Sequence, residues 1–187
     1  MEDVLDVYVR LLDPKRPQVC FDESSKQQVK EVRTPLPSAP GHPARYDTAY
    51  ERNGGSNLFM FFCPLLNWRH VKVTDRRTSR DWAEGMRELV DVHFPDAERI
   101  TVVQDNLNTH TPAARYAAFE PAEAKRIWDK LEFHYTPKHG SWLNMAEIEL
   151  SVLSRQCRDR RIADQEALRR EVAACETERN TSGATVN

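Results

Sequence analysis

The stretch Ile100-Thr-Val-Val-Gln-Asp105 indicates the fold class of this 187-residue chain. It is rich in β-branched side chains, which favour strands, and it closes on an acid. Before it, apolar residues recur at spacings of three and four, which predicts an amphipathic helix that Thr78 or Ser79 can cap. The apolar positions of that helix are Trp82, Met86, Leu89, Val90 and, as a further candidate, His93. A helix followed by a strand is the pattern of an α/β fold.

The same alternation continues after this strand. Thr111 with Pro112 predicts a helix running to about residue 119, and residues 121–130 predict a second short helix. Leu131–Tyr135 is the next strand. A long helix over about 143–157 follows the loop at 137–140.

Three further strands are predicted on the N-terminal side: 17–22, 57–63 and 69–74. A proline-rich loop at 34–43 separates the first two, and Asn-Gly-Gly at 53–55 signals a turn. Three leading strands followed by alternating helices and strands predict an α/β fold, with a mixed five-stranded sheet flanked by helices.

Composition places the chain among soluble globular proteins. Twenty-seven basic and 29 acidic residues give a net charge of −2, with 40% apolar and 30% charged residues. The longest apolar run, Leu58–Leu66, contains a proline and is far shorter than the roughly 20 residues that cross a bilayer. The N-terminus is acidic, unlike a secretory signal. We therefore expect a cytoplasmic protein with no membrane partner, and the charge argues against a free-standing basic nucleic-acid binder.

Four cysteines lie far apart: Cys20, Cys63, Cys157 and Cys175. None has a second ligand at zinc spacing, so a structural zinc site is not expected. The simplest expectation is four reduced thiols.

Asp22 and Asp105 each close an apolar strand. A buried carboxylate is costly, so acids belong at strand ends where a cleft can open. If the two strands are parallel neighbours about 4.8 Å apart, the carboxylates emerge side by side and repel unless a cation lies between them. Divalent ions such as Mg²⁺ prefer carboxylate oxygens, and a pair of them can activate a nucleophile and stabilise a leaving oxygen. For either aspartate alone, a capping or turn role is the favoured interpretation, and it is the pair of acids that indicates a metal site.

The position of a third acid is open on geometry alone. On a helical wheel of residues 143–157, Glu147 and Glu149 lie about 80° to either side of the main apolar face. Both therefore border buried surface, and the wheel does not choose between them.

Three stretches resemble the catalytic core of bacterial mariner-like insertion-sequence transposases of the DDE superfamily. They are Val19-Cys-Phe-Asp-Glu23, Val102-Val-Gln-Asp-Asn-Leu-Asn-Thr-His110 and Tyr135-Thr-Pro-Lys-His-Gly-Ser-Trp-Leu-Asn-Met-Ala-Glu147. The third contains the family's Leu-Asn-x-x-Glu motif. The resemblance implies an RNase H-like fold and the catalytic and metal-binding triad Asp22, Asp105 and Glu147. Its motif companions are Asn106, His110 and Asn144.

The resemblance also implies an activity and its cofactor: DNA strand cleavage and strand transfer with two Mg²⁺ ions, for which Mn²⁺ can substitute. The implied partners are transposon-end and target DNA, with a homodimer assembled on DNA. Residues 17–165 would be the catalytic domain, 1–16 a short lead-in and 166–187 a truncated C-terminal tail. Because sixteen residues cannot hold the family's helix-turn-helix region, a separate DNA-binding segment is expected.

Basic, aromatic and amide side chains near the motifs are candidate DNA contacts: Arg76, Arg77, Lys138, His139, Trp142 and Asn144. Basic residues would neutralise phosphates without reading sequence, although a solvated surface explains them equally well. Two alternatives stay open. One is a decayed remnant that binds DNA or self-associates without cutting, and the other is a phosphodiesterase of the same fold that acts on RNA or RNA–DNA hybrids.

Overall fold

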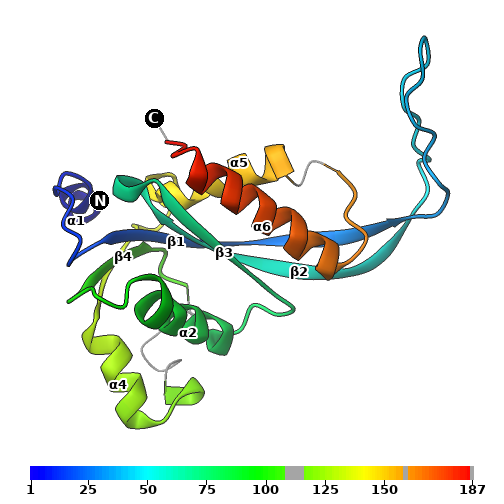
Figure 1. Ribbon diagram of the computed structural model, residues 1–187. Helices are drawn as coiled ribbons and strands as arrows, with labels where there is room; N and C mark the ends of the chain where they lie inside the picture. Colours follow the sequence, from blue (N-terminus) through cyan, green and yellow to red (C-terminus); the bar gives the residue numbers. More distant parts are fainter. Residues whose placement is uncertain (108–115, 158–159, 186–187) are drawn as a thin grey trace.

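A five-stranded sheet forms the centre of the computed structural model, which describes residues 1–107, 116–157 and 160–185 (Figure 1). Its strands are β1 (Gln18–Glu31), β2 (Tyr50–Cys63), β3 (Trp68–Thr74), β4 (Ile100–Gln104) and β5 (Leu131–Tyr135). Their order across the sheet is β3-β2-β1-β4-β5. The first three strands form an antiparallel meander, whereas β4 and β5 run parallel to β1. The predicted mixed five-stranded sheet is confirmed.

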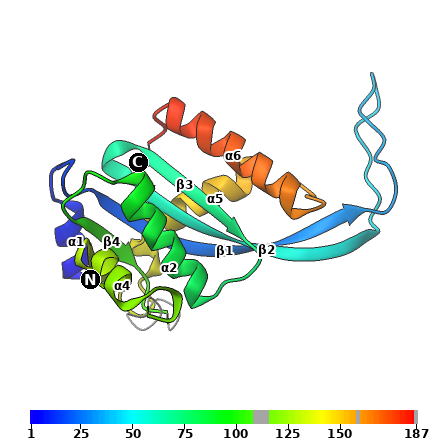
Figure 2. The same ribbon diagram turned by 60° about the horizontal axis from the view of Figure 1, so that its bottom comes forward.

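Helices cover both faces of this sheet, and Figure 2 shows α2 and α4 on the face opposite α5 and α6. One face carries α1 (Glu2–Tyr8), α5 (Met145–Cys157) and α6 (Gln165–Thr181). The other carries α2 (Ser79–Glu88), a π-helical turn η2 (Leu89–His93) and α4 (Pro121–Asp129). Two 3₁₀ turns, η1 (Pro64–Leu66) and η3 (Ser141–Leu143), follow β2 and precede α5, respectively. The predicted helix at 111–119 begins outside the described residues.

The apolar run of β2 fills both cores because neighbouring side chains of a strand point to opposite faces. Leu58, Met60 and Phe62 pack beneath α5 and α6. Phe59 and Phe61 pack beneath α2. A strand covered on both faces has no need of polar positions, which explains the unbroken apolar stretch.

Helix α2 begins as predicted at Thr78. The Thr78 hydroxyl accepts a hydrogen bond from the Asp81 backbone N–H, and the Asp81 carboxylate accepts one from the Thr78 N–H. This reciprocal cap satisfies two backbone donors that the helix itself cannot. The helix then lies very close to the sheet at Gly85, where an added Cβ would come within 2.9 Å of Phe61 Cζ.

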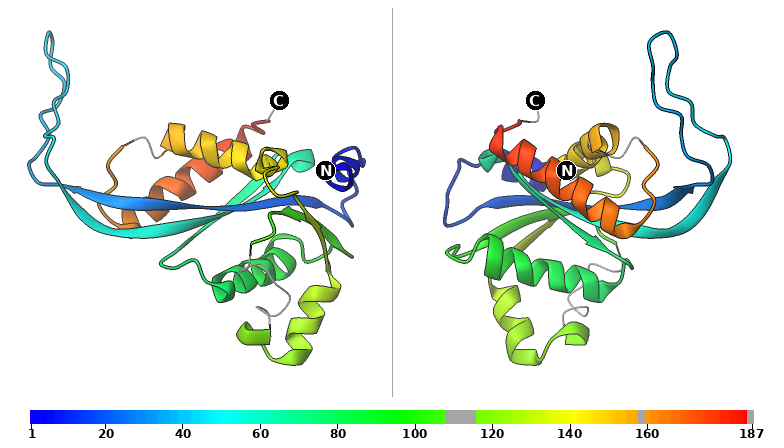
Figure 3. Two further views of the ribbon diagram at one scale, coloured as in Figure 1. Left: turned by 180° about the vertical axis from the view of Figure 1, so that it is seen from behind. Right: turned by 45° about the vertical axis from the view of Figure 1, so that its right-hand side comes forward.

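The long β1–β2 hairpin differs from the sequence prediction. Strand β1 continues nine residues past Asp22 to Glu31, which pairs with Tyr50. The Asn-Gly-Gly segment at 53–55 is no turn but lies within β2, where the register shifts and Gly54 takes a φ of 89°. Glycine at this position allows the positive φ of a β-bulge. The predicted turn is therefore wrong, although the residues do mark a place where the backbone needs glycine. Residues 32–49 project from the body as a narrow arm, seen from two sides in Figure 3.

The two terminal helices pack onto the sheet. In α1, Val4 and Val7 are fully buried. In α6, the Asn180 amide donates to the Arg69 carbonyl (2.8 Å) and accepts from the Arg69 N–H (2.9 Å). Glu176 also accepts from a β3 backbone N–H, at 2.9 Å. Both helices therefore contribute to the core beneath α5.

Within the described residues, no helix is both long and apolar enough to span a membrane. Cys20 and Cys63 are buried free thiols, but Cys175 is disulfide-bonded. The expectation of four reduced thiols was therefore wrong for Cys175. A disulfide needs two cysteines close together in the folded chain, and the spacing of cysteines in the sequence does not show which of them meet.

Candidate active site

The first two acids of the predicted triad are in register on neighbouring parallel strands. The pairing of β1 with β4 ends at Cys20 and Val103, and Asp22 and Asp105 each lie two residues beyond that pair. Since side chains alternate along a strand, each aspartate points to the same face as the paired residue before it. Cys20 and Val103 both belong to the core beneath α5. Both aspartates therefore emerge on the α5 side of the sheet.

The third predicted acid, Glu147, lies in the first turn of α5. It shares with Asp22 a hollow of about 430 Å³ between the helix and β1. The hollow is lined by Asp22, Glu23, Ser24, Glu147, Leu150, Ser151 and Ser154. The three serines are a set that the sequence reading missed. Ser151 and Ser154 follow Glu147 by four and seven residues, so they lie on the same face of the helix, and this spacing could have predicted them.

The carboxylates are close enough to affect one another. Burial raises the pKa of Asp22 to about 7, and repulsion from Glu23, Asp105 and Glu147 adds to the rise. A hydrogen bond of 2.8 Å from the Glu23 backbone N–H to Asp22 Oδ1 opposes it. A bound cation would relieve this repulsion.

The chemistry of this donor set suits a hard divalent ion, since all three groups are carboxylates. In the described part of the chain, however, no three His, Cys, Asp or Glu side chains are grouped tightly enough to form a complete ligand set. An ion held here would therefore keep water or substrate oxygens among its ligands, as Mg²⁺ usually does.

Glu149, the other acid that the helical wheel left open, is buried and engaged elsewhere. Its carboxylate lies 2.9 Å from Arg179 Nη2 and 3.1 Å from Arg69 Nε. The side chains of Glu149 and Arg69 are 1% and 2% exposed. A buried charge needs such partners, so Glu149 serves to join α5 to β3 and α6.

Asn144, predicted as a DNA contact and motif companion, is 1% exposed. Its Nδ2 donates to the Phe21 carbonyl at 2.7 Å, and its Oδ1 accepts from the Ala146 N–H at 3.1 Å. Both polar atoms of the side chain are thus used inside the protein.

Several other candidates surround Asp105. A second hollow, of about 660 Å³, is lined by Asp105, Asn106, Leu107, Thr136, Pro137, Lys138, His139 and Ser141. Lys138 and His139 are exposed, and Trp142 nearby in sequence is 67% exposed. His139 has a φ of 68°, in the left-handed region. His110 lies outside the described residues.

Arg76 and Arg77 lie between β3 and α2 and are both exposed. Arg77 Nη1 is 3.7 Å from Glu23 Oε1, and the Glu23 side chain is 1% exposed. Alternation along β1 places Glu23 on the sheet face opposite Asp22, the face that α2 covers. Arg77 is therefore linked to the strand that carries the first acid, through a residue that the sequence reading did not single out.

Comparisons with known proteins agree with this architecture. A family model described as DDE superfamily endonuclease matches residues 17–169. No curated protein matches the chain. Two solved structures, a Mos1 mariner paired-end complex with Mn and a Mos1 transposase paired-end complex with the left transposon end, each match with a TM-score of 0.62 at 16% identity. Each match covers 97% of this chain and 55% of the other.

The Mos1 strand transfer complex matches with a TM-score of 0.61 at 16% identity, over 97% of this chain and 54% of that one. Likeness at this identity establishes the fold, and it confirms the expected RNase H-like arrangement of sheet and helices. The chain spans about half the length of these solved proteins.

Proposed function

The chain belongs to the DDE superfamily endonuclease family, and on this premise we propose that it is the catalytic domain of a DNA transposase. It cleaves DNA strands at the ends of an insertion sequence and joins them to target DNA. The observation that carries this proposal is the register of Asp22 with Asp105 on parallel strands, on the face where Glu147 lines a shared hollow. The solved Mos1 complexes, which contain transposon ends, support the substrate class.

In this proposal the three carboxylates hold two Mg²⁺ ions, or Mn²⁺ in substitution. Asp22 would contribute to both sites, and Asp105 and Glu147 would each complete one of them. The ions supply Lewis acidity that favours deprotonation of the attacking oxygen and stabilises the leaving one. The chain's own contribution is to hold the carboxylates on a rigid sheet and helix, so that attack occurs in line with the departing oxygen. Water would attack phosphorus first and break the P–O3′ bond, which frees a 3′-hydroxyl and leaves a 5′-phosphate. That hydroxyl would then attack a phosphorus of the target DNA and displace a 3′-oxygen there, and no covalent bond to the protein forms.

DNA contacts are proposed around the second hollow, where Lys138 and His139 lie beside Asp105. Trp142 offers an exposed ring against which a base or sugar can stack. Arg76 and Arg77 add positive charge on the other side of β1. We propose a homodimer on DNA, a separate helix-turn-helix segment for recognition of the ends, and action in the cytoplasm. Residues 17–165 carry the catalytic domain in this proposal, and α1 from the lead-in and α6 from the tail pack into its core.

One observation favours the alternative of a non-catalytic remnant that only binds DNA or self-associates. The acids of the described residues are not grouped as a complete ligand set. A remnant would still bind DNA but would show no metal-dependent cutting.

Cleavage of supercoiled plasmid DNA in the presence of Mn²⁺ distinguishes the catalytic domain from the non-catalytic remnant. We expect the wild-type chain to nick the plasmid and Asp105→Asn to abolish nicking while the protein stays folded. Asp129→Asn is the matched control, because Asp129 is an exposed aspartate on α4 that pairs with Lys125 at the helix surface. Nicking by Asp105→Asn would contradict the triad. A folded wild-type chain that binds DNA without nicking it would favour the remnant.

A further inference from the structure

One buried amide contacts the peptide groups next to two of the proposed catalytic acids. Asn144 Nδ2 donates to the carbonyl of Phe21, the residue before Asp22, at 2.7 Å. Asn144 Oδ1 accepts from the N–H of Ala146, the residue before Glu147, at 3.1 Å. A single side chain therefore links β1 and the start of α5 immediately beside both carboxylates.

The Asn144 side chain is buried among apolar neighbours and does not reach solvent. Asn144 is 1% exposed, and Leu143 and Ala146 on either side of it are buried as well. Beyond Cys20, β4 no longer pairs with β1. The Asn144 amide thus holds β1 on the edge where β4 no longer pairs with it, while β2 still pairs with β1 on the other edge.

A second side chain spans the same junction from α1. The Tyr8 hydroxyl donates to the carbonyl of Leu143 at 2.7 Å and lies 3.4 Å from Cys20 Sγ. Cys20 is two residues before Asp22, and Leu143 is the neighbour of Asn144. Burial raises the pKa of Tyr8 well above its usual range, so the hydroxyl keeps its proton as a donor.

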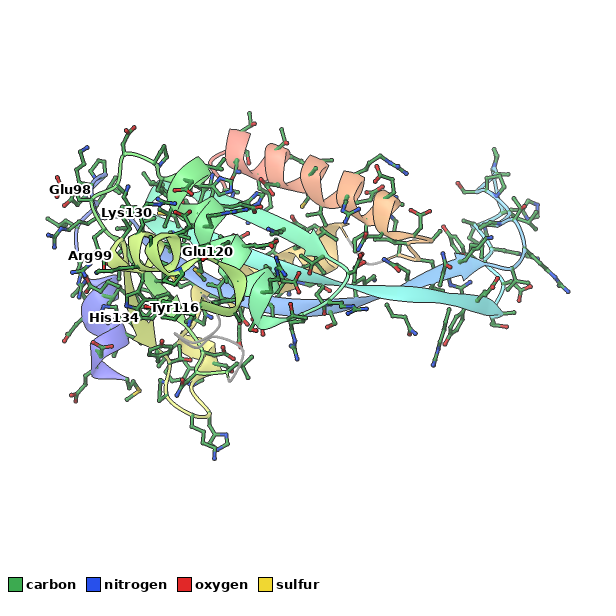
Figure 4. The ribbon with its side chains drawn as sticks, turned by 90° about the horizontal axis from the view of Figure 1, so that it is seen from below. Glu98, Arg99, Tyr116, Glu120, Lys130 and His134 are labelled. Carbon is green, nitrogen blue, oxygen red and sulfur yellow. The ribbon has the colours of Figure 1, made fainter. Side chains whose placement is uncertain are left out.

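Helix α1 is itself fixed to the sheet. His134 of β5, labelled in Figure 4, lies with its Nδ1 2.8 Å from an Asp3 carboxylate oxygen and its Nε2 3.0 Å from Glu132. Val4 and Val7 are fully buried on the same helix. Tyr8 is therefore presented from a firmly anchored element.

We propose that Asn144 and Tyr8 are positioning residues, which together set the separation of Asp22 from Glu147. Helix α1, although it precedes the stretch 17–169 that matches the family, is then a working part of the acid site. The proposal rests on the function proposed above. Displacing a carboxylate by about 1 Å is enough to weaken metal binding and catalysis markedly, so two short hydrogen bonds at this joint have large effects.

Calorimetric titration with Mn²⁺, with and without a short DNA duplex, tests the proposal apart from activity. We expect Asn144→Ala to weaken Mn²⁺ binding by about 10- to 100-fold, as is typical of lost outer-shell support. Tyr8→Phe removes a single hydroxyl, and we expect a smaller loss of roughly 2- to 10-fold. Should Asn144→Ala fail to fold, Tyr8→Phe gives the same answer.

The matched control is Asn180→Ala. Asn180 also bridges two elements through paired backbone hydrogen bonds, between α6 and β3, but not beside the acids. We expect it to lower the Tm while leaving Mn²⁺ affinity within about twofold of wild type. Unchanged affinity in both Asn144→Ala and Tyr8→Phe, or an equal loss in Asn180→Ala, would overturn the positioning role. If wild type and Asp105→Asn take up Mn²⁺ identically, the proposed function itself fails, and this inference with it.

Discussion

At the scale of single residues, the raised pKa of Asp22 makes the folded state less stable as the pH rises. Most aspartates, whose pKa is lowered on folding, have the opposite effect. Burial and the neighbouring carboxylates raise its pKa from 3.8 to about 7 in the folded chain. Between pH 4 and 7 the folded chain therefore keeps a proton that the unfolded chain releases, so stability falls as pH rises through this window. The loss is on the order of 2–4 kcal/mol, complete above pH 7 and absent below pH 4.

Asp22→Asn removes that penalty, so we expect the variant to be more stable than wild type at pH 8 and equal to it near pH 4. The measurement is thermal unfolding in a chelating buffer across this pH range. Asp129→Asn, at the exposed α4 surface, serves as the control and should follow wild type throughout. A wild-type chain that gains stability from pH 4 to 7 relative to Asp22→Asn would contradict the raised pKa.

The two glutamates of α5 should behave in opposite ways. Glu149→Gln weakens a buried ion pair with Arg69 and Arg179, and we expect it to cost about 2–4 kcal/mol of unfolding free energy. Glu147 lines the hollow beside Asp22, so Glu147→Gln should change stability by less than about 1 kcal/mol while abolishing Mn²⁺-dependent cleavage. Urea denaturation and the plasmid assay measure the two effects. Exchanged phenotypes would mean that the roles of these acids are reversed.

At the scale of elements, the approach of α2 to β2 depends on Gly85. Alanine within a helix normally gains about 1 kcal/mol over glycine. Here the added Cβ would meet Phe61 Cζ at 2.9 Å, and that ring is buried against Phe21 at a centroid distance of 5.0 Å. Because the ring or the helix must shift within a packed core, we expect Gly85→Ala to destabilise the protein by about 1–3 kcal/mol.

Urea denaturation measures this cost. Arg80→Ala, on the exposed side of the same helix, is the control for an alanine substitution that meets no buried ring. It removes a surface ion pair with Glu84, worth a few tenths of a kcal/mol. If Gly85→Ala stabilises the chain, the helix can move away from the sheet and the contact is not limiting.

Elements with a strong local signal were predictable from sequence, and elements set by distant contacts were not. The β-branched stretch of β4 and the Thr78 cap of α2 lie where expected. The length of β1 was not predictable, because it depends on pairing with β2 and on a glycine-permitted bulge that resembles a turn in sequence. The choice between Glu147 and Glu149 could not be made from the helical wheel. It depends on the contact of Glu149 with Arg69, which is 80 positions away in the sequence.

At the scale of the whole molecule, the projecting arm contributes little to the stability of the body. Its tip holds only isolated bridges, Leu36 with Arg45 and Ala39 with His42. The base is held by the β1–β2 pairing, which ends at Glu31 and Tyr50, and by Arg161, which pairs with Glu31. We expect replacement of residues 34–45 by an Asn-Gly turn to shift Tm by less than about 3 °C.

The matched variant is Arg161→Ala, which leaves the tip intact but removes the ion pair with Glu31 at its base. It should loosen the arm, and limited proteolysis should then cut within residues 32–49 faster than in wild type. A large loss of Tm on removing the tip alone would show that the arm is part of the folding core.

The pairing of β1 with β4 joins distant parts of the sequence, and this bears on the order in which the strands form during folding. The meander β1–β2–β3 joins neighbours in sequence, whereas the Cys20–Val103 pair closes a separation of 83 positions and Asn144 reaches Phe21 across 123. Long closures carry a larger entropic cost and form late. We therefore expect a chain emerging from the ribosome to gain its first three strands well before its acids meet, which pulsed hydrogen exchange during refolding can follow. If the proposed function holds, a partly folded chain would be unable to cleave DNA until its acids have come together.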